Sequence, residues 1–325
     1  MRRKPYVFIT RTLPDSTLEP LLDLARISMW EEADKPVPRE RLEKEAEEAD
    51  AILTMVSDPV DRELLEGAPN LRVVSNMGVG YDNIDLQAAD EMGIIVCNTP
   101  DILTETTADL TFALLLASAR RITEASDLVR SGNWREWGPL LMAGHDVYGK
   151  TIGIVGMGRI GTGVAKRASG FSMNVLYHNR TRRKETENET GAAYAPLDRL
   201  LKESDFVVCL APLTEETKQM FTYHEFRLMK RSAFFINASR GGLVDERGLV
   251  KALEDKQIAG AGLDVFQEEP VDPGHPLLSF PNVTVLPHIG SATVETRKRM
   301  AQLACRNIAY VLKGYRPKAV VNRVD

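Results

Sequence analysis

The sequence predicts an α/β fold made of two domains, each built around a parallel β-sheet. Short β-rich runs alternate with longer helical stretches almost from end to end, and such alternation is typical of βαβ units. The alternation starts afresh at Lys150, after an irregular segment. At 325 residues, the chain is long enough for about two domains that each bury a core.

The first alternating series occupies the N-terminal part of the chain. Strands are expected at Tyr6–Thr10, Ala51–Val56, Leu71–Ser75 and Ile94–Asn98, and helices at Leu18–Arg26, Arg39–Ala49 and Ile84–Met92. One long helix is expected from Ile102 to Arg130, because apolar residues recur there at helical spacing. Ser131-Gly132-Asn133 is a helix stop.

The second series begins with the strand expected at Thr151–Val155. Further strands are expected at Asn174–Tyr177, Asp205–Leu210, Ala233–Asn237, Ala261–Val265 and Val283–Leu286, and a closing helix at Ala292–Lys313. Many two-domain α/β proteins share this pattern, so function must be argued from site residues.

Composition and charge argue against several classes of protein. The chain has 41 basic and 46 acidic residues and a net charge of −5, which does not attract a nucleic-acid backbone. No apolar run approaches the roughly 20 residues of a membrane span, and the basic start at Met1–Pro5 lacks the apolar core of a secretion signal. We expect a cytoplasmic protein that binds neither nucleic acid nor membrane.

The three cysteines, Cys97, Cys209 and Cys305, are scattered along the chain. Cys97 and Cys209 end apolar runs, so we expect them to be reduced strand residues. No pair of Cys or His residues has the spacing of metal ligands. We therefore expect no metal site.

A glycine-rich turn predicts a dinucleotide site. Gly156, Gly158 and Gly161 have the G-x-G-x-x-G spacing, between an apolar strand and a helix expected at Thr162–Ala168. The first glycine permits a tight turn, the second lets the backbone approach a pyrophosphate, and the third lets helix and strand pack closely. The helix N-terminus then faces the phosphates with free N–H groups. The alternative is a glycine-rich turn without a ligand.

The next strand indicates which cofactor binds. NAD-binding folds place an acidic residue about 20 residues further on, where it accepts hydrogen bonds from the ribose 2′-hydroxyl. Here no acidic residue occurs from Met157 to Lys184, and Arg180 stands between Asn179 and Thr181. Arg180 can offer a 2′-phosphate a bidentate fork, and its neighbours can add neutral hydrogen bonds. We predict a preference for NADP(H) and leave NAD(H) open, the alternative being a solvated basic loop.

Five ordered motifs carry a resemblance to a known family. They are the glycine turn, Asn76-Met-Gly78-Val-Gly80-Tyr-Asp-Asn, Phe235-Ile-Asn-Ala-Ser-Arg240-Gly-Gly, Gly262-Leu-Asp264-Val-Phe-Gln-Glu-Glu269-Pro270 and Leu286-Pro-His288-Ile-Gly-Ser-Ala-Thr293. The chain resembles the D-isomer-specific 2-hydroxyacid dehydrogenases over essentially its whole length. Within that family it is most similar to the bacterial glyoxylate/hydroxypyruvate reductases, including those that act on 2-ketogluconate.

The resemblance implies a catalytic set of Arg240, Glu269 and His288. Reduction of a 2-keto acid places negative charge on the carbonyl oxygen, and a protonated imidazole, with an ordinary pKa of about 6.5, can donate to it. A carboxylate favours the imidazolium, and an arginine can hold the substrate carboxylate. The family motif places the carboxylate directly before proline, which selects Glu269 over Glu268. Taken singly, each of the three residues could be structural.

The resemblance also implies the remaining site residues. Backbone N–H groups around Val79 and Gly80 should receive the substrate carboxylate, together with Arg240 and His288. Asp264 should bond near the nicotinamide, and Leu210–Thr214 should border the adenosine half. The expected cofactor-binding set is Thr106, Gly156, Gly158, Arg159, Ile160, Gly161, Asn179, Arg180, Thr181, Ala211, Pro212, Thr217, Ala238, Ser239, Arg240, Asp264, His288 and Gly290.

The same family has two Rossmann-like domains with a discontinuous substrate domain. The resemblance places the substrate domain at residues 1–99 and 288–325 and the dinucleotide-binding domain at residues 100–287. It also places the segment Trp134–Met142 in a homodimer contact, although a core role for its tryptophans stays open.

These observations predict an NADPH-preferring reductase of a small 2-keto acid, namely glyoxylate, hydroxypyruvate or 2-ketogluconate, to its D-2-hydroxy acid. Two alternatives stay open. One is another dehydrogenase of the family, such as an NAD-dependent enzyme resembling phosphoglycerate dehydrogenase. The other is a non-catalytic dinucleotide sensor, which would not need a retained proton donor.

Overall fold

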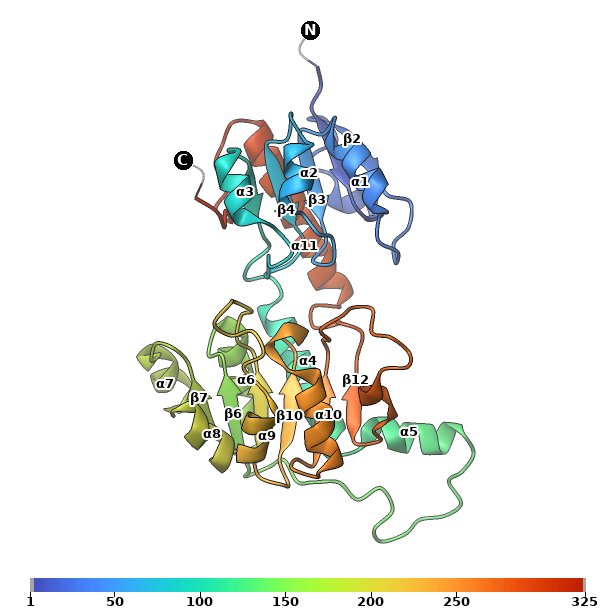
Figure 1. Cartoon of the computed structure of the whole chain (residues 1–325), viewed down its shortest axis with the longest axis vertical. Helices are drawn as coiled ribbons and strands as arrows, with labels where there is room; N and C mark the ends of the chain where they lie inside the picture. The colour runs from blue at the N-terminus through green and yellow to red at the C-terminus, as the bar shows by residue number, and fades with distance from the viewer. Residues whose placement is uncertain (1–2, 324–325) are drawn as a thin grey trace. The chain divides into compact units, whose positions relative to one another are not determined.

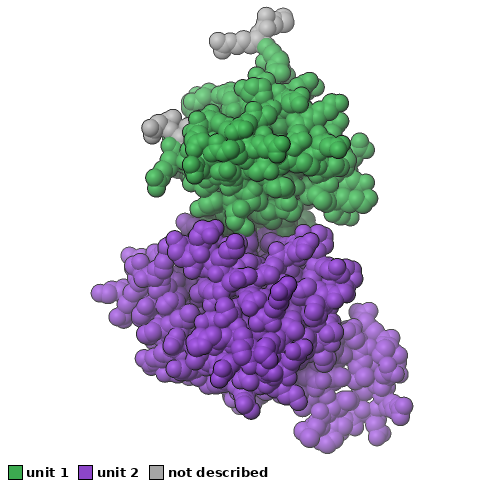
Figure 2. All heavy atoms as spheres, viewed as in Figure 1, with its two compact units in different colours: residues 1–103, 292–325 green, residues 104–291 purple. Residues whose placement is uncertain are grey.

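A computed structural model describes residues 3–323 and divides the chain into two compact units. Unit 1 comprises Met1–Leu103 and Ala292–Asp325, and unit 2 comprises Thr104–Ser291 (Figure 2). Unit 1 is thus discontinuous in sequence, whereas unit 2 is one uninterrupted stretch. The two boundaries each lie four residues beyond those expected from the sequence.

Unit 1 is a five-stranded parallel sheet with strand order β2-β1-β3-β4-β5 (Figure 1). Its strands are β1 (Tyr6–Ile9), β2 (Arg26–Met29), β3 (Ala51–Thr54), β4 (Val73–Asn76) and β5 (Ile95–Cys97). Its helices are η1 (Asp15–Thr17), α1 (Arg39–Ala46), α2 (Arg62–Glu66), α3 (Leu86–Glu91) and α11 (Val294–Leu312). The closing helix α11, capped by the Thr293 side chain, packs against β3, β4 and β5.

The predicted helix at Leu18–Arg26 is wrong. The chain there forms successive turns, with Leu21 N–H donating to Leu18 O at 2.8 Å, and then enters β2 at Arg26. The turns begin earlier than expected, with η1 at Asp15, so Pro20 falls beyond the first turn, where its missing N–H prevents continuation as an α-helix. The short strand β2 was not predicted.

Unit 2 is a seven-stranded parallel sheet with strand order β12-β11-β10-β9-β6-β7-β8. Its strands are β6 (Thr151–Val155), β7 (Asn174–His178), β8 (Ala193–Tyr194), β9 (Phe206–Cys209), β10 (Phe234–Asn237), β11 (Gly260–Leu263) and β12 (Val283–Val285). Its helices are α4 (Thr104–Ala119), α5 (Ile122–Arg130), α6 (Arg159–Gly170), α7 (Lys184–Thr190), α8 (Leu197–Glu203), α9 (Tyr223–Leu228), α10 (Glu246–Glu254), η2 (Gly241–Leu243) and η3 (Pro276–Ser279). The α/β class with parallel sheets is therefore confirmed, and only β8 lies outside the strands predicted for this region.

The helix expected from Ile102 to Arg130 is two helices. α4 ends at Ala119 and α5 begins at Ile122, with Arg121 between them in the left-handed region at φ +53°. The carbonyl of Ala119 accepts a hydrogen bond from His145 N–H at 2.8 Å, so the returning chain satisfies a group that a continuous helix would bond internally. Figure 1 shows α5 and the segment after it extending away from the sheet of unit 2.

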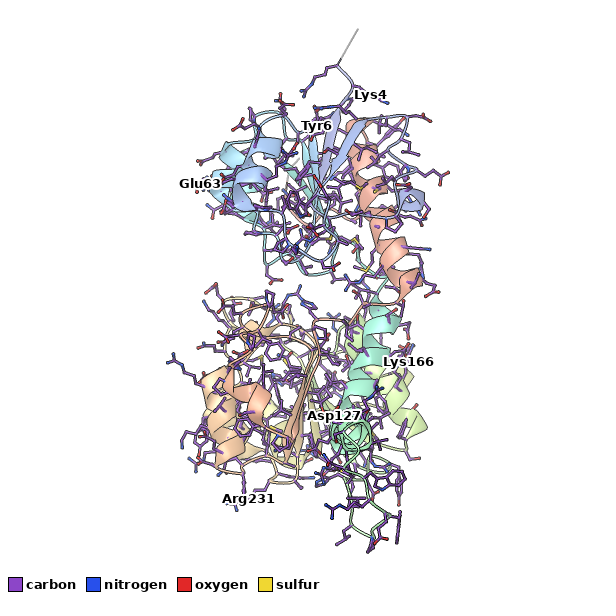
Figure 3. The ribbon with its side chains drawn as sticks, turned by 90° about the vertical axis from the view of Figure 1, so that its right-hand side faces the viewer. Lys4, Tyr6, Glu63, Asp127, Lys166 and Arg231 are labelled. Carbon is purple, nitrogen blue, oxygen red and sulfur yellow. The ribbon has the colours of Figure 1, made fainter. Side chains whose placement is uncertain are left out.

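Alternate residues of the unit 2 strands supply two apolar cores, one on each face of the sheet. One face, with Val207 and Phe235, packs against α8, α9 and α10, and the other, with Val208 and Ile236, packs against α4 and α6 (Figure 1). In Figure 3, Lys166 lies on the outer side of α6, where it pairs with Glu189 of α7 at 2.6 Å. Both faces of the sheet are thus covered by helices. Ligands of such sheets bind at the carboxyl ends of the strands.

The structure also describes the state of the cysteines, the groups that could bind a metal, and the helices that could cross a membrane. Cys97, Cys209 and Cys305 are free and buried, and burial raises the pKa of each thiol to about 12. Within residues 3–323, no group of three His, Cys, Asp or Glu could hold a metal ion. No helix of that range combines the length and apolar character of a membrane-crossing segment.

Candidate active site

The three expected catalytic residues follow three adjacent strands of unit 2. Arg240 follows β10, Glu269 lies in the turn after β11, and His288 follows β12. Because the strands are parallel, all three side chains belong to the carboxyl edge of the sheet. That is the edge where ligands bind in open α/β sheets.

Glu269 and His288 form a hydrogen-bonded pair. His288 Nδ1 lies 2.6 Å from Glu269 Oε2, and about a third of each side chain is exposed. Glu269 Oε1 accepts a hydrogen bond from Phe266 N–H at 2.9 Å, which fixes the carboxylate from its other side. Since Nδ1 faces the carboxylate, Nε2 is the ring nitrogen that can give a proton to a substrate.

The environment of Glu269 favours its ionised form. Burial of the carboxyl would raise its pKa, but several interactions outweigh burial and hold the pKa below its usual value. They are the hydrogen bond and charge of His288, the N–H of Phe266 and the positive charge of Arg240. An ionised Glu269 can accept a hydrogen bond from His288 Nδ1 and so orient the ring.

Asp264 fixes the backbone that carries His288. His288 adopts the left-handed conformation at φ +53°, and its N–H donates to Asp264 O at 2.8 Å. The Asp264 carboxylate accepts hydrogen bonds from the N–H groups of Ile289 and Gly290, both at 2.8 Å. Burial raises the pKa of Asp264 above its usual value, while those N–H groups and His288 act against the rise. The buried carboxylate thus holds the strained turn in place.

Arg240 is brought close to the Glu269 turn by the glycine that follows it. A Cβ on Gly241 would lie 1.8 Å from the carbonyl carbon of Phe266, so only glycine permits this approach of the two turns. Asn237 Nδ2 donates to Arg240 O at 2.9 Å, and Arg240 Nη1 donates to Ser239 O at 2.9 Å. The backbone of Arg240 is therefore fixed, and the charge of its guanidinium contributes to the lowered pKa of Glu269.

The glycine turn has the geometry of a phosphate-binding turn. Gly156 has φ +104°, and a Cβ there would lie 2.4 Å from Ala211 N, so the turn packs directly on the segment after β9. A Cβ on Gly161 would lie 2.4 Å from Gly156 O, whereas a Cβ on Gly158 would meet nothing within 4 Å. Gly158 is the N-cap of α6, so the open space lies at the N-terminus of a 12-residue helix.

The turns around this space are tied to one another. Ser239 Oγ donates to Ala211 O at 2.6 Å, and Thr217 Oγ1 donates to Pro212 O at 2.7 Å. Gly290 packs against Thr107 in the first turn of α4, next to the half-buried Thr106. The expected cofactor residues after β6, β9, β10 and β12 thus share one edge of unit 2.

In the loop after β7, Arg180 is exposed, whereas Asn179 and Arg182 make hydrogen bonds to other residues. Asn179 Oδ1 accepts a hydrogen bond from Met157 N–H at 2.8 Å, so this amide is bonded to the glycine turn. Arg182 donates two hydrogen bonds to the carboxylate of Glu187, at 2.7 and 2.8 Å. Arg180, in contrast, is exposed, and its charge contributes, after the hydrogen bond from Thr214, to keeping the pKa of Glu216 below its usual value.

Tyr177 and Glu187 shape this loop, and neither was expected in the site. Tyr177 Oη donates to Glu187 at 2.6 Å and accepts from Arg183 N–H at 2.7 Å. The hydrogen bond from Arg182, followed by that from Tyr177, lowers the pKa of Glu187 to about 2. Their sequence separation of ten residues gives no pattern that sequence reasoning could have used.

Val79 and Gly80 lie in unit 1, on the bend that follows β4. The Val79 side chain is partly exposed, and Asn98 Nδ2 donates to Val79 O at 2.9 Å. The segment thus lies at the carboxyl edge of the unit 1 sheet.

Known proteins provide an independent comparison. The model of the D-isomer specific 2-hydroxyacid dehydrogenase NAD-binding domain matches residues 112–290. A protein named glyoxylate reductase from Korarchaeum cryptofilum is 48% identical over 98% of this chain and 96% of its own length. The chain belongs to the D-isomer specific 2-hydroxyacid dehydrogenase family.

Solved structures of this dehydrogenase family have the same fold. A protein from Thermus thermophilus matches with a TM-score of 0.90 and 44% identity, covering 97% of this chain and 99% of that one. The NADPH-dependent glyoxylate/hydroxypyruvate reductase of Sinorhizobium meliloti, in complex with NADP and malonate, matches with a TM-score of 0.84 and 33% identity, covering 99% and 98%. The chain is therefore an NAD(P)-dependent 2-hydroxyacid dehydrogenase that uses a nicotinamide dinucleotide and a small-molecule substrate.

The dehydrogenase's own residues fit such a cofactor. The open space at Gly158 faces the free N–H groups at the start of α6, which suits a pyrophosphate, and β6 lies where the strand order reverses between β9 and β7. Because the chain belongs to a family of enzymes, the alternative of a non-catalytic dinucleotide sensor is no longer favoured.

Proposed function

We propose that this dehydrogenase reduces a small 2-keto acid to its D-2-hydroxy acid with NADPH, and that His288 donates the proton. The observation that carries the proposal is the 2.6 Å pair of His288 and Glu269 beside Arg240, at the edge of the sheet that also holds the glycine turn. The bound cofactor supplies a hydride to the carbonyl carbon of the substrate.

The residues of the chain account for the rest of the reaction. As negative charge develops on the carbonyl oxygen, the proton on His288 Nε2 is transferred to it, and Glu269 stabilises the imidazolium before transfer. Arg240 holds the substrate carboxylate and polarises the carbonyl. We assign carboxylate binding also to the N–H groups of Val79 and Gly80 in unit 1, as the family resemblance implies. In the reverse direction, His288 accepts the hydroxyl proton.

The exposed Arg180 supports the preference for NADPH. A 2′-phosphate needs a free cation, and Arg182, the next arginine, is already bound to Glu187. Thr181 can add a neutral hydrogen bond, while Asn179 keeps the loop against the glycine turn. The Sinorhizobium meliloti relative is named NADPH-dependent, which agrees with this assignment.

Glyoxylate is the first substrate to test, with hydroxypyruvate and 2-ketogluconate beside it. The Korarchaeum relative is named a glyoxylate reductase, and the Sinorhizobium relative is named for glyoxylate and hydroxypyruvate. All three candidates present a carboxylate next to a carbonyl, which is what Arg240 and His288 recognise in this mechanism.

The protruding segment of unit 2 supports a homodimer. Ile122, Val129, Trp134, Trp137 and Leu140 are each more than half exposed there. So much exposed apolar surface on one segment is typical of a protein–protein contact. We place the working enzyme in the cytoplasm as a homodimer.

The test is NADPH oxidation with each of the three keto acids, measured on the unmodified protein and on His288→Ala. We expect turnover with at least one keto acid, and a loss in kcat of about 10²–10⁴ in the variant, the usual contribution of general acid catalysis. NADPH titration should show that the variant still binds the cofactor. Turnover of His288→Ala near that of the unmodified protein would mean that another residue donates the proton.

A further inference from the structure

The segment from Gly78 to Gly80 has all of its carbonyl groups bonded to the interior of unit 1. Gly78 O accepts from Thr99 N–H at 2.8 Å, Val79 O accepts from Asn98 Nδ2 at 2.9 Å, and Gly80 O accepts from Asn76 Nδ2 at 2.8 Å. The three donors come from the ends of β4 and β5. Three successive carbonyl groups are therefore held on one side of the segment.

The direction of the N–H groups follows from the planarity of the peptide. In a trans peptide the C=O of one residue and the N–H of the next point in opposite directions. With the carbonyls of Gly78, Val79 and Gly80 turned inward, the N–H groups of Val79, Gly80 and Tyr81 face the other way. Within residues 3–323, none of these three N–H groups donates a hydrogen bond, although unpaired backbone donors are uncommon in folded proteins.

The two asparagines that fix this arrangement are themselves immobilised. Asn76 is fully buried, and its Oδ1 accepts a hydrogen bond from Thr54 Oγ1 at 3.0 Å. Asn98 is 7% exposed, and its backbone bonds to Ala319 O at 3.1 Å and to Asn307 Nδ2 at 3.1 Å. The bond from Thr54 holds the side-chain amide of Asn76 directly, and the bonds of Asn98 fix the backbone from which its buried amide extends.

We propose that Asn76 and Asn98 are positioning residues that turn three successive amides toward the substrate carboxylate, with Tyr81 N–H as the third donor. The proposal rests on the proposed function, which supplies the anion. A carboxylate has two oxygens that together accept about four hydrogen bonds, so three donors can be accommodated. The amides are oriented before the substrate arrives, so binding does not have to order them.

The first test follows the backbone amides of the ¹⁵N-labelled full-length protein by NMR while oxalate, an unreactive analogue of a 2-keto acid, is added. We expect the amide signals of Val79, Gly80 and Tyr81 to shift together and to saturate at one dissociation constant. If the Tyr81 signal stays in place while the other two shift, Tyr81 is not a donor and the proposal fails. This measurement needs no variant, so it stands even if a substitution prevents folding.

The second test replaces the amide of Asn98. Asn98→Asp keeps the shape but removes the donor to Val79 O, so the peptide between Val79 and Gly80 loses its anchor. Because these amides bind the carboxylate in both ground state and transition state, the variant should raise KM for the keto acid by about tenfold or more and change kcat far less.

Asn70→Asp is the matched control. Asn70 is an exposed amide of the same unit that also donates to a backbone carbonyl, that of Glu47 at 3.3 Å. It introduces the same charge away from the segment, so its KM and oxalate affinity should equal those of the unmodified protein. Equal behaviour of the two variants would refute the positioning role. If no keto acid is reduced but oxalate still moves the three amides, the proposed function fails and the anion site stands.

Discussion

Replacing Glu269 by Gln tests the central pair of the site most directly. The substitution keeps the shape of the side chain but removes the charge that lies 2.6 Å from His288 Nδ1. Reduction needs a protonated His288. Without the carboxylate the protonated ring is stabilised less, so reduction should begin to decline at a lower pH. The alkaline limb of the pH profile of kcat/KM should therefore move downward.

The size of the shift follows from the geometry. A hydrogen bond to a charged group contributes about 1.5–3 kcal/mol, and solvent screening of a pair that is about one-third exposed favours the lower end of that range. A loss of about 1.5 kcal/mol corresponds to a roughly tenfold fall in kcat/KM on the alkaline side of the profile. At low pH, where the ring is protonated in either protein, the loss of activity should be smaller.

The assay is kcat/KM for the best keto acid with saturating NADPH, measured from about pH 5 to 9. Glu268→Gln is the control. Glu268 is the exposed neighbour of Glu269, so this substitution removes the same charge from a side chain one residue away. The reasoning is refuted if Glu269→Gln leaves the alkaline limb in place. It is equally refuted if Glu268→Gln moves the limb as far, since Glu268 would then be the partner of His288.

Three further predictions concern the arginines and the cofactor loop. Arg180→Ala should reduce the preference for NADPH over NADH by about 1–3 kcal/mol, the scale of a charge-assisted contact, as measured by kcat/KM with both cofactors. Arg231→Ala should not, because Arg231 precedes β10 at the amino end of the strands, whereas Arg180 follows β7 at their carboxyl end. Arg240→Lys keeps the charge but loses the planar fork, so both KM and kcat should worsen; unchanged steady-state constants would remove Arg240 from the mechanism. Glu187 has a folded-state pKa of about 2, below its usual 4.5, so its contribution to stability is present above about pH 4.5 and is lost as the pH falls toward 2. Glu187→Gln should therefore lower the melting temperature at pH 7, and the difference should shrink on acidification; a difference independent of pH would contradict this.

The parts of the fold that sequence could predict are those specified by local patterns. The strands of unit 2 are apolar runs with turn residues at their ends, and the glycine turn has a spacing that its geometry requires, as the φ of +104° at Gly156 shows. The two helix predictions that are wrong also have local physical causes. Pro20 breaks the helix expected at Leu18–Arg26, and the left-handed Arg121 separates α4 from α5.

The parts of the site that sequence missed depend on contacts between distant residues. No sequence pattern indicated that the Asp264 carboxylate accepts hydrogen bonds from the N–H groups of Ile289 and Gly290, 25 and 26 residues further on. Two of the three interior hydrogen bonds of the Gly78–Gly80 carbonyls likewise come from another strand end, that of β5. Side-chain identity specifies such bonds only after the sheet has brought the strand ends together.

The discontinuity of unit 1 has a consequence for the order in which the protein can fold during synthesis. The strands β1 to β5 leave the ribosome first, but the helix that covers β3, β4 and β5 is α11, near the end of the chain. Met300, Ala304 and Ile308 of that helix are almost fully buried, so the apolar surface they cover stays open until all of unit 2 has been made. Unit 2, as one uninterrupted stretch, can complete its core first. The nascent N-terminal sheet is therefore the part of this enzyme most exposed to aggregation, and loss of the C-terminal helix should be far more damaging than its position at the chain end suggests.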